Sequence, residues 1–193
     1  MYIIMNKRGF TLIELIFIIA VVGILAAIAI PKIDLTNLRI NLAAEKMQAD
    51  IRYTQRLAMD IQKRTRVSFS TASDNYTVYI ENSPGSWITA TDPRTRGNFT
   101  IQLNQDEFVG VDITWVFFNV ANRDLLFDMF GTPYDYNTAT GIATPLADPA
   151  RVRVNRRRDI RVTQNTGRVF IQSVLTPVPV PVQLQPLLLQ FNQ

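Results

Sequence analysis

The residue types that most often carry catalytic or metal chemistry are scarce in this chain of 193 residues, which has no histidine and no cysteine. A Ser-His-Asp or Cys-His catalytic arrangement is therefore impossible, as is a zinc site with histidine or cysteine ligands. Carboxylates alone can run some hydrolytic reactions, but no pair of carboxylates here stands out as a catalytic constellation. We expect neither enzymatic activity nor a cofactor.

Oxygen ligands for calcium are one remaining option. The segment from Asp124 to Asp135 also contains Asp128, and Asn137 follows it closely. Their spacing matches no EF-hand, and carboxylates in loops usually cap turns. We therefore predict no metal site in this segment.

Positive charge is concentrated in residues 151–161, which hold six arginines and one aspartate, a charge of +5 against +4 for the whole chain. If the segment begins as a strand, Arg151, Arg153 and Asn155 lie on one face, while Val152 and Val154 point inward. The next three arginines would then form an exposed turn. The arginines of this basic segment are Arg151, Arg153, Arg156, Arg157, Arg158 and Arg161.

Three roles are open for the basic segment. It could hold nucleic-acid phosphates through ion pairing and counterion release. It could contact anionic lipid head groups or acidic neighbouring chains. It could also be a solvated sheet edge whose charge prevents pairing with another chain. No aromatic residue is interleaved within the segment, and the nearest is Phe170, so the stacking of single-stranded bases gains no support from it.

A single carboxylate, Glu14, lies within an otherwise apolar segment. From Phe10 to Ile30 the 21 residues are apolar or small, apart from Thr11 and Glu14. As a helix this segment is about 31 Å long, which is enough to cross the hydrocarbon core of a bilayer. A carboxylate at such a depth is costly and usually has a function.

Glu14 needs a positive partner, and the apolar segment offers none. If the chain were cut after Gly9, Phe10 would carry a free α-amine at the start of the same helix. The amine of one copy could then pair with Glu14 of a neighbouring copy, which would cancel two charges that are costly alone in hydrocarbon. The alternative is a plain single-pass anchor that is never cut.

The flanks of the apolar segment predict its orientation. Lys7 and Arg8 precede it, so the positive-inside rule places the N-terminus in the cytoplasm and the rest of the chain on the other side of the membrane. Nothing after Ile30 resembles the cleavage site of a secretory signal peptide, so we interpret residues 10–30 as a retained membrane span. Pro31 lacks an N–H group and would kink or loosen the helix there.

From Lys32 to about Lys63 the pattern remains helical, with apolar residues three or four positions apart. We expect an amphipathic continuation of the helix that packs on a globular head. The residues that we assign to its packed face are Leu35, Leu38, Leu42, Met47, Ile51, Thr54, Leu57, Ala58 and Ile61.

After Lys63 the pattern becomes typical of strands. Residues 66–70 and 76–80 predict a hairpin with a turn at 72–75. No helical pattern separates the later strands, so we expect an antiparallel sheet and an α+β fold, in which the long transmembrane and amphipathic helix packs on a β-sheet head. The later strands are predicted at 99–103, 113–119, 125–127, 151–154, 160–163 and 168–172.

The chain should therefore comprise a leader (1–9), an N-terminal helix (10–63, of which 10–30 span the membrane), a β-rich head (64–175) and a tail (176–193). In the tail, proline alternates with valine from Thr176 to Val182, a pattern that favours extended polyproline II structure. Apolar residues follow up to Phe191. The tail either lies along the head or docks on a neighbouring chain.

The segment from Gly9 to Leu15, which reads GFTLIEL, resembles the N-terminal signal of type IV prepilins and type II secretion pseudopilins. The resemblance implies that a prepilin peptidase cuts after Gly9 and N-methylates Phe10. It also makes Glu14 the glutamate of that signal, the fifth residue of the mature chain, and it places Pro31 where many members of the family carry a proline.

The head is similar to one branch of that family, the GspH/FimT minor subunits. The similarity lies in a helix that leads into a β-hairpin, followed by the segments Phe127–Pro133, Asp159–Val162 and Thr166–Val169. It implies a minor, structural subunit of a type II secretion pseudopilus or a type IV pilus. The implied alternative is a DNA-binding minor pilin that acts in DNA uptake through the basic segment, since FimT-like minor pilins bind DNA.

The resemblance also implies a location and a set of partners. The subunit would sit in the inner membrane as a single-pass protein, with its head in the periplasm or outside, before it enters the filament. Its partners would be other pilin or pseudopilin subunits, the prepilin peptidase, an inner-membrane assembly platform and membrane lipid, with DNA as a further option.

Overall fold

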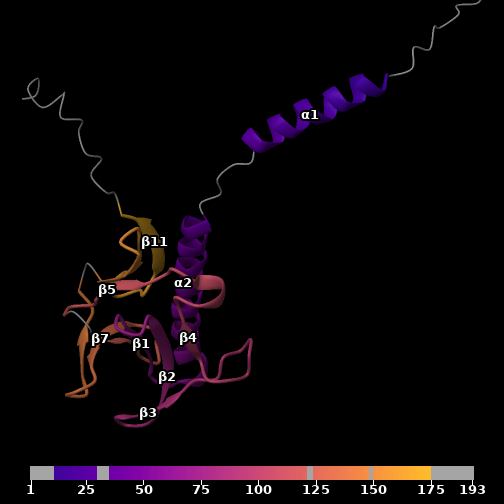
Figure 1. Ribbon diagram of the computed structural model, residues 1–193. Coiled ribbons are helices and arrows are strands. Elements are labelled where there is room, and N and C mark those ends of the chain that lie inside the picture. Colours follow the sequence, from indigo (N-terminus) through magenta and orange to yellow (C-terminus); the bar gives the residue numbers. More distant parts are fainter. Residues whose placement is uncertain (1–10, 30–34, 121–123, 148–149, 175–193) are drawn as a thin grey trace, which may run out of the picture. The chain divides into compact units, whose positions relative to one another are not determined.

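The computed structural model describes residues 11–29, 35–120, 124–147 and 150–174 (Figure 1). The chain divides into two compact units, Met1–Leu35 and Thr36–Gln193. Gly9, Phe10 and Pro31, the leader and the tail 176–193 lie outside the described residues.

The N-terminal unit contains the helix α1 (Leu12–Ala29). Thr11 begins it, because its Oγ1 accepts a hydrogen bond of 3.3 Å from the Glu14 amide and its carbonyl accepts one of 3.2 Å from the Leu15 amide. A threonine in this position satisfies an amide that the first turn leaves unpaired. Among the residues that the structure describes, no helix combines the length and the apolar character needed to cross a membrane.

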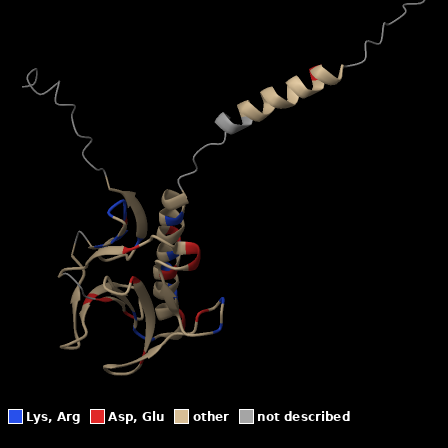
Figure 2. Ribbon diagram, viewed as in Figure 1, with Lys and Arg blue, Asp and Glu red and all other residues tan. Residues whose placement is uncertain are grey.

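The second unit begins with α2 (Leu35–Ile61), along which basic and acidic residues are interspersed (Figure 2). Its buried face consists of Ile40, Ala43, Ala44, Met47, Asp50, Ile51, Thr54 and Ala58.

The predicted packed face of α2 is wrong in its first half and at its last residue, Ile61, which is 37% exposed. Leu35, Leu38 and Leu42 are 52%, 49% and 46% exposed, whereas Ala43 and Ala44 are buried. The helix therefore carries two apolar stripes in this half, and the head covers the one with alanines, whose small side chains allow the sheet to approach closely.

Two antiparallel sheets complete the head (Figure 1). The seven-stranded sheet has the order β3-β2-β1-β6-β7-β8, with β4 also paired to β2, and the four-stranded sheet has the order β11-β10-β9-β5. The first sheet contains β1 (Thr65–Ser70), β2 (Asn75–Ser83), β3 (Ser86–Thr89), β4 (Thr100–Gln102), β6 (Asp124–Phe127), β7 (Pro133–Asn137) and β8 (Ile142–Pro145). The second contains β5 (Ile113–Phe117), β9 (Ala150–Val154), β10 (Arg158–Val162) and β11 (Val169–Ser173).

This architecture confirms the predicted α+β class and the antiparallel pairing. The predicted hairpin is β1 and β2, which pair from Thr65 opposite Ile80 to Ser70 opposite Asn75. Each later predicted strand overlaps an observed one. The strands β3, β7 and β8 were not predicted; each has only four or five residues, and β7 begins with Pro133, a position that proline tolerates in a strand.

α2 and both sheets share one hydrophobic core, whose largest fully buried aromatic side chains are Tyr76, Phe99, Phe118 and Phe127. One polar cluster lies inside it. The Asp50 carboxylate on α2 accepts hydrogen bonds from Lys46 Nζ (2.6 Å) and from the Tyr76 hydroxyl on β2 (2.7 Å). Burial raises the pKa of Asp50 and, more strongly, that of Tyr76. The bond to Tyr76 joins α2 to β2 inside the core.

Candidate functional site

Glu14 lies in the first turn of α1 and is exposed. Its side chain has no ion-pair or hydrogen-bond partner in the described part of the chain. The positive end of the helix favours a carboxylate in this position. The pairing of Glu14 with the α-amine of a neighbouring Phe10 stays a prediction, and Gly9, Phe10 and Pro31 lie outside the described residues.

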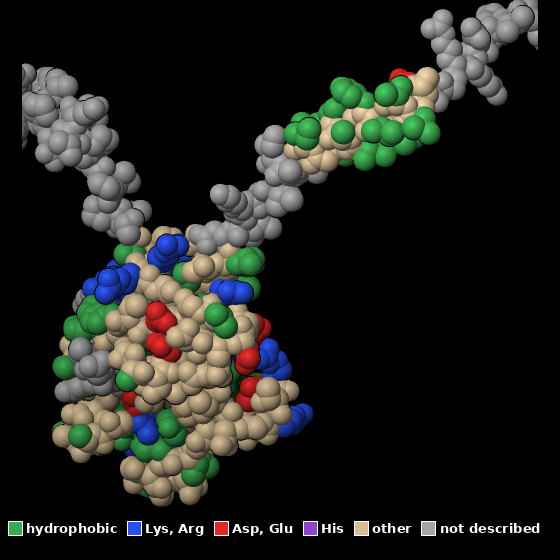
Figure 3. Space-filling view, viewed as in Figure 1, with side chains coloured by type: hydrophobic (Ala, Val, Ile, Leu, Met, Phe, Trp, Pro, Cys, Tyr) green, Lys and Arg blue, Asp and Glu red, His purple; other side chains and the backbone are tan. Residues whose placement is uncertain are grey.

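From Leu12 to Leu25, α1 exposes its apolar side chains, and Figure 3 shows those on one face of the helix. Leu12, Ile13 and Phe17 are 78%, 76% and 69% exposed. A helix that is apolar all round is stable in hydrocarbon or among other helices rather than in water. Leu35, Leu38 and Leu42 on α2 form a second apolar surface, which the described residues leave about half exposed.

The basic segment forms part of the outer face of the four-stranded sheet. Val152 and Val154 are fully buried, and Arg151 and Arg153 lie on the opposite face, which confirms the predicted alternation. Arg153 binds the buried Asp159 through two bonds, from Nε to Oδ1 (2.7 Å) and from Nη2 to Oδ2 (2.9 Å). These bonds raise the pKa of Arg153. Arg151 Nη1 lies 3.6 Å from the same carboxylate.

Two further arginines fasten the β9–β10 turn to α2. Arg158 donates from Nε to Asn41 Oδ1 (2.8 Å) and from Nη1 to Ser173 Oγ (2.6 Å), and Arg157 donates to Asn37 Oδ1. The predicted exposed turn is therefore wrong for Arg158, which is half-buried and opens β10, because the turn folds back onto the helix.

Only two arginines of the basic segment, Arg156 and Arg161, lack a side-chain hydrogen bond or ion pair within the described ranges. Arg156 is exposed in the turn and has a positive φ of 55°. Arg161 lies opposite Arg151 across the β9–β10 ladder. The density of charge in the sequence thus overstates the number of cations that are free to meet a ligand.

The structure adds aromatic rings that the sequence analysis missed. Trp115 and Phe117 on β5 stack at 5.2 Å between centroids and 19° between planes. The guanidinium groups of Arg151 and Arg153 lie 4.6 Å and 5.6 Å from the Trp115 centroid. The alternation of Trp115 and Phe117 in the predicted strand 113–119 could have placed both rings on one face. Their position beside Arg151 and Arg153 could not be predicted, because it depends on the pairing of β5 with β9, which are far apart in sequence.

The acidic residues of the possible calcium segment have other roles. Asp124 pairs with Arg66, and Asp128 Oδ1 caps the β6–β7 turn by accepting from the amides of Phe130 (2.9 Å) and Thr132 (2.8 Å). In the segments that the structure describes, no three potential metal ligands of the acidic, histidine or cysteine type come together.

Gln55 of α2 joins two turns of the head. Its Nε2 donates to the carbonyls of Gly131 (2.8 Å) and Thr166 (2.9 Å), in the β6–β7 and β10–β11 turns. A Cβ atom on Gly167 would lie only 2.5 Å from this nitrogen, and Gly167 has a φ of +63°. The glycine therefore permits both the turn and the approach of Gln55.

We expect Gly167→Ala to lower the free energy of unfolding by about 1–3 kcal/mol, through backbone strain and loss of the Gln55 bonds. Urea denaturation of the protein in detergent would measure this. Gly97→Ala is the matched control, because a Cβ there would meet only Thr95 Oγ1 at 3.7 Å. Equal stability of the two variants would contradict the role of Gln55.

Comparison with known proteins finds a sequence motif at the N-terminus. Residues 4–30, which include Gly9, Phe10 and Glu14, match the family described as the prokaryotic N-terminal methylation motif. The N-terminal segment therefore carries this methylation motif. No curated protein matches the sequence. Among solved structures, the minor pseudopilin EpsH from the type 2 secretion system of Vibrio cholerae is similar at a TM-score of 0.49 and 9% identity, over 72% of this chain and 99% of that one.

Proposed function

We propose that this protein is a structural, minor subunit of a type II secretion pseudopilus or a type IV pilus. It is cut after Gly9, methylated at Phe10, and held in the inner membrane by residues 10–30 with its head on the outer side. A prepilin peptidase processes it, and an inner-membrane platform extracts it from the lipid. The observation that carries this proposal is the methylation motif together with the exposed Glu14 at the start of an apolar helix.

Assembly would use the two uncovered apolar surfaces. The α-amine of Phe10 in one subunit pairs with Glu14 of a neighbour, and the apolar sides of α1 pack among other helices. The leucine stripe of α2, with residues three and four apart, continues this contact beyond the membrane. Pro31, which lies outside the described residues, has no N–H group to donate within a continuous helix.

Mass spectrometry of the protein purified from its native membrane tests the processing. We expect a mature chain that begins with N-methylated Phe10, because the resemblance of the segment GFTLIEL to the prepilin signal implies cleavage after Gly9. Gly9→Val is the matched control, in which the precursor should accumulate. A native chain that keeps Met1 in the assembled state would overturn the proposal.

A second candidate function is DNA capture by the outer face of the four-stranded sheet. The observation in its favour is the combination of Trp115 and Phe117 with Arg151 and Arg153 on one surface. Aromatic rings that stack bases, beside cations that hold phosphates, are typical of single-strand binding. The ion pairs of Arg153 with Asp159 and the bonds of the turn to α2 reduce the charge available for this role.

Gel shifts of the detergent-solubilised protein with single-stranded DNA, over a range of salt concentrations, test this second function. We expect Trp115→Ala to weaken binding by about fivefold or more, because one stacked base contributes about 1–3 kcal/mol. Arg156→Gln and Arg161→Gln should make the affinity for DNA less dependent on salt concentration. Arg94→Gln, an exposed arginine outside this face, is the control. Equal affinity of all variants for DNA would exclude this face as the DNA-binding surface.

A further inference from the structure

A cationic groove of about 400 Å³ lies between α2 and the β10–β11 turn. Its lining residues are Arg52, Gln55, Arg56, Arg168 and Val169. The three arginines are exposed, and none of them forms an ion pair within the described residues. This holds even for Arg56, although Asp60 follows it one helical turn later. Three guanidinium groups without a carboxylate around one groove favour an anionic occupant.

Hydrogen bonds hold the walls of this groove in place. Arg52 Nη2 donates to the Val169 carbonyl at 2.7 Å, which leaves most of the guanidinium N–H groups of Arg52 for an occupant. Gln55 Nε2 donates to carbonyls of the β6–β7 and β10–β11 turns, at 2.8 Å and 2.9 Å. An occupant therefore meets a preorganised surface, which lowers the entropic cost of binding.

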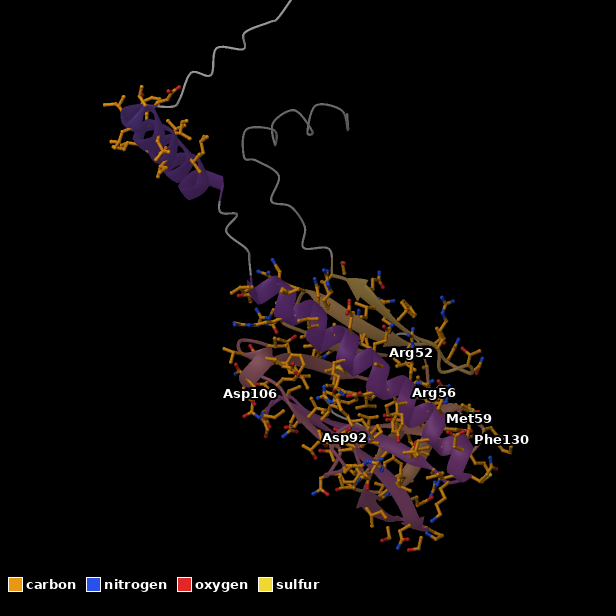
Figure 4. All side chains as sticks on the ribbon, turned by 90° about the vertical axis from the view of Figure 1, so that its right-hand side faces the viewer. Arg52, Arg56, Met59, Asp92, Asp106 and Phe130 are labelled. Atoms are coloured by element: carbon orange, nitrogen blue, oxygen red, sulfur yellow. The ribbon has the colours of Figure 1, made fainter. Side chains whose placement is uncertain are left out.

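An apolar surface lies beside the cationic groove. Phe130, at the tip of the β6–β7 turn, is 77% exposed. Met59, which is 36% exposed, packs against the next residue of that turn, since its Sδ lies 3.0 Å from the position that a Cβ on Gly131 would occupy. Figure 4 shows Phe130 and Met59 next to each other, on the same side of α2 as Arg56. A large exposed ring on a turn that hydrogen bonds hold in place is typical of an anchor in a protein interface.

The combination of free cations and apolar side chains favours a protein segment as the occupant. A carboxylate can pair with an arginine through two parallel hydrogen bonds, and an apolar side chain beside it can pack on Phe130. Single-stranded nucleic acid fits less well, because bases stack on successive aromatic rings, whereas the exposed neighbour of Phe130 is the thioether side chain of Met59. Methionine adapts its shape to apolar side chains of many kinds.

We propose that this groove receives an acidic segment of a different pilin-like subunit in the same filament. Carboxylates of that segment pair with Arg56 and Arg168, and an apolar side chain beside them packs on Phe130 and Met59. A minor subunit is outnumbered in its filament, so its neighbours are other chains, and each copy needs this contact only once. The inference rests on the proposed function, and it gives the head a contact of its own, separate from that of the N-terminal helices.

Carbodiimide cross-linking of native membranes tests this contact. The reagent joins a carboxylate to an adjacent lysine amine with loss of water, and it does not join a carboxylate to arginine. Arg56→Lys and Arg168→Lys keep the positive charge and place an amine in the groove. Each variant should give a new intermolecular product, in which mass spectrometry locates a link from the introduced lysine to an aspartate or glutamate of another chain that carries the N-terminal methylation motif. Arg96→Lys, at an exposed position between β3 and β4, is the matched control and should give no such product.

Charge reversal and side-chain truncation supply the specificity of the test. In the Arg168→Lys background, Arg56→Glu should lower the yield of the cross-linked product by about tenfold or more, because like charges then face each other. An arginine in place of the partner's acid that Arg56→Lys links should restore the yield. Phe130→Ala should also lower the yield by about tenfold or more, because an interface anchor is lost, whereas Ile142→Ala, at a 57% exposed position on β8, should not.

Several results would overturn this inference. If neither lysine variant forms the product while methylated Phe10 and recovery in filaments are intact, the head contact fails and the proposed function stands. A link to a second copy of this chain, a link to a protein without the motif, or a yield that Arg56→Glu leaves unchanged would also overturn the inference. If no link forms and Arg56→Glu/Arg168→Glu abolishes gel shifts with single-stranded DNA, the groove binds nucleic acid instead. A chain that keeps Met1 in the assembled state would overturn the proposed function and this inference together.

Discussion

Glu14→Ala should leave the protein in the inner membrane and largely remove it from filaments. The substitution makes the apolar helix more hydrophobic, so insertion does not suffer. In the assembled state, however, the α-amine of a neighbouring Phe10 would be left unpaired in a medium of low dielectric constant. Removal of one partner from a buried ion pair costs about 3–5 kcal/mol, which predicts a loss of incorporation of at least about a hundredfold at equilibrium.

The measurement is the ratio of this subunit in sheared or purified filaments to that in the membrane fraction, by quantitative immunoblotting. Glu14→Gln keeps the shape of the side chain and removes its charge, so it should fail in the same way if pairing is ionic. Asp60→Ala, an exposed carboxylate on α2, should assemble normally. Full incorporation of Glu14→Ala would contradict the pairing argument, even if cleavage after Gly9 is confirmed.

Asp124→Ala should destabilise the head more strongly than Gly167→Ala. The Asp124 carboxylate pairs with Arg66, and the two side chains are only 8% and 12% exposed. The Arg66 guanidinium also lies 4.4 Å from the Tyr79 centroid and 4.9 Å from that of Trp87, so it cannot turn to solvent without leaving these rings. An arginine does not lose its proton in proteins, and we expect a loss of about 3–5 kcal/mol.

Removal of the other partner, by Arg66→Met, should lower the free energy of unfolding by less than Asp124→Ala does. The size of this loss should depend on pH. Burial raises the pKa of Asp124 above its usual 3.8, while Arg66 lowers it. Without Arg66 that pKa rises further, and the carboxyl can take up a proton instead of remaining charged. A group whose pKa is raised in the folded state contributes stability at low pH and loses it as the pH rises through that pKa. The deficit of Arg66→Met should therefore shrink from about pH 8 to about pH 5.

Urea denaturation of detergent-solubilised protein at both pH values would measure these effects. The double variant Arg66→Met/Asp124→Leu should recover much of the loss, because a buried ion pair can often be replaced by apolar side chains of similar volume. Asp60→Ala, whose carboxylate is exposed, should stay within about 0.5 kcal/mol of the parent. A loss of that small size for Asp124→Ala would contradict the role assigned to the pair.

Different charged residues serve the stability and the function of this protein. Asp50, Asp124 and Asp159 are buried and each meets a cation of the head, so they serve its folding. Glu14 is exposed and has no such partner in the described part of the chain. The predictions above follow this division: loss of the buried Asp124 carboxylate lowers stability, and loss of the exposed Glu14 carboxylate lowers assembly.

Local patterns in the sequence were sufficient for several features. An apolar segment with one carboxylate, preceded by two cations and a glycine, predicts the helix α1, and the same segment matches the N-terminal methylation motif. The change from helical to strand periodicity after Lys63 predicts the α+β class, and the alternation at Val152 and Val154 predicts the face that β9 buries. These features depend on residues close together in the chain, which is why periodicity and short motifs reveal them.

Tertiary structure alone decided which charges and which apolar faces remain free. The basic segment loses most of its free cations to Asp159, Asn37 and Asn41, and it gains Trp115 from a strand far away in sequence. α2 has two apolar stripes, and only packing against the sheets selects the one with Ala43 and Ala44 and leaves Leu38 exposed. The groove likewise joins Arg56 to Arg168 across more than a hundred residues. Contacts of this range depend on how strands pair and how a helix docks, and no local pattern encodes that choice.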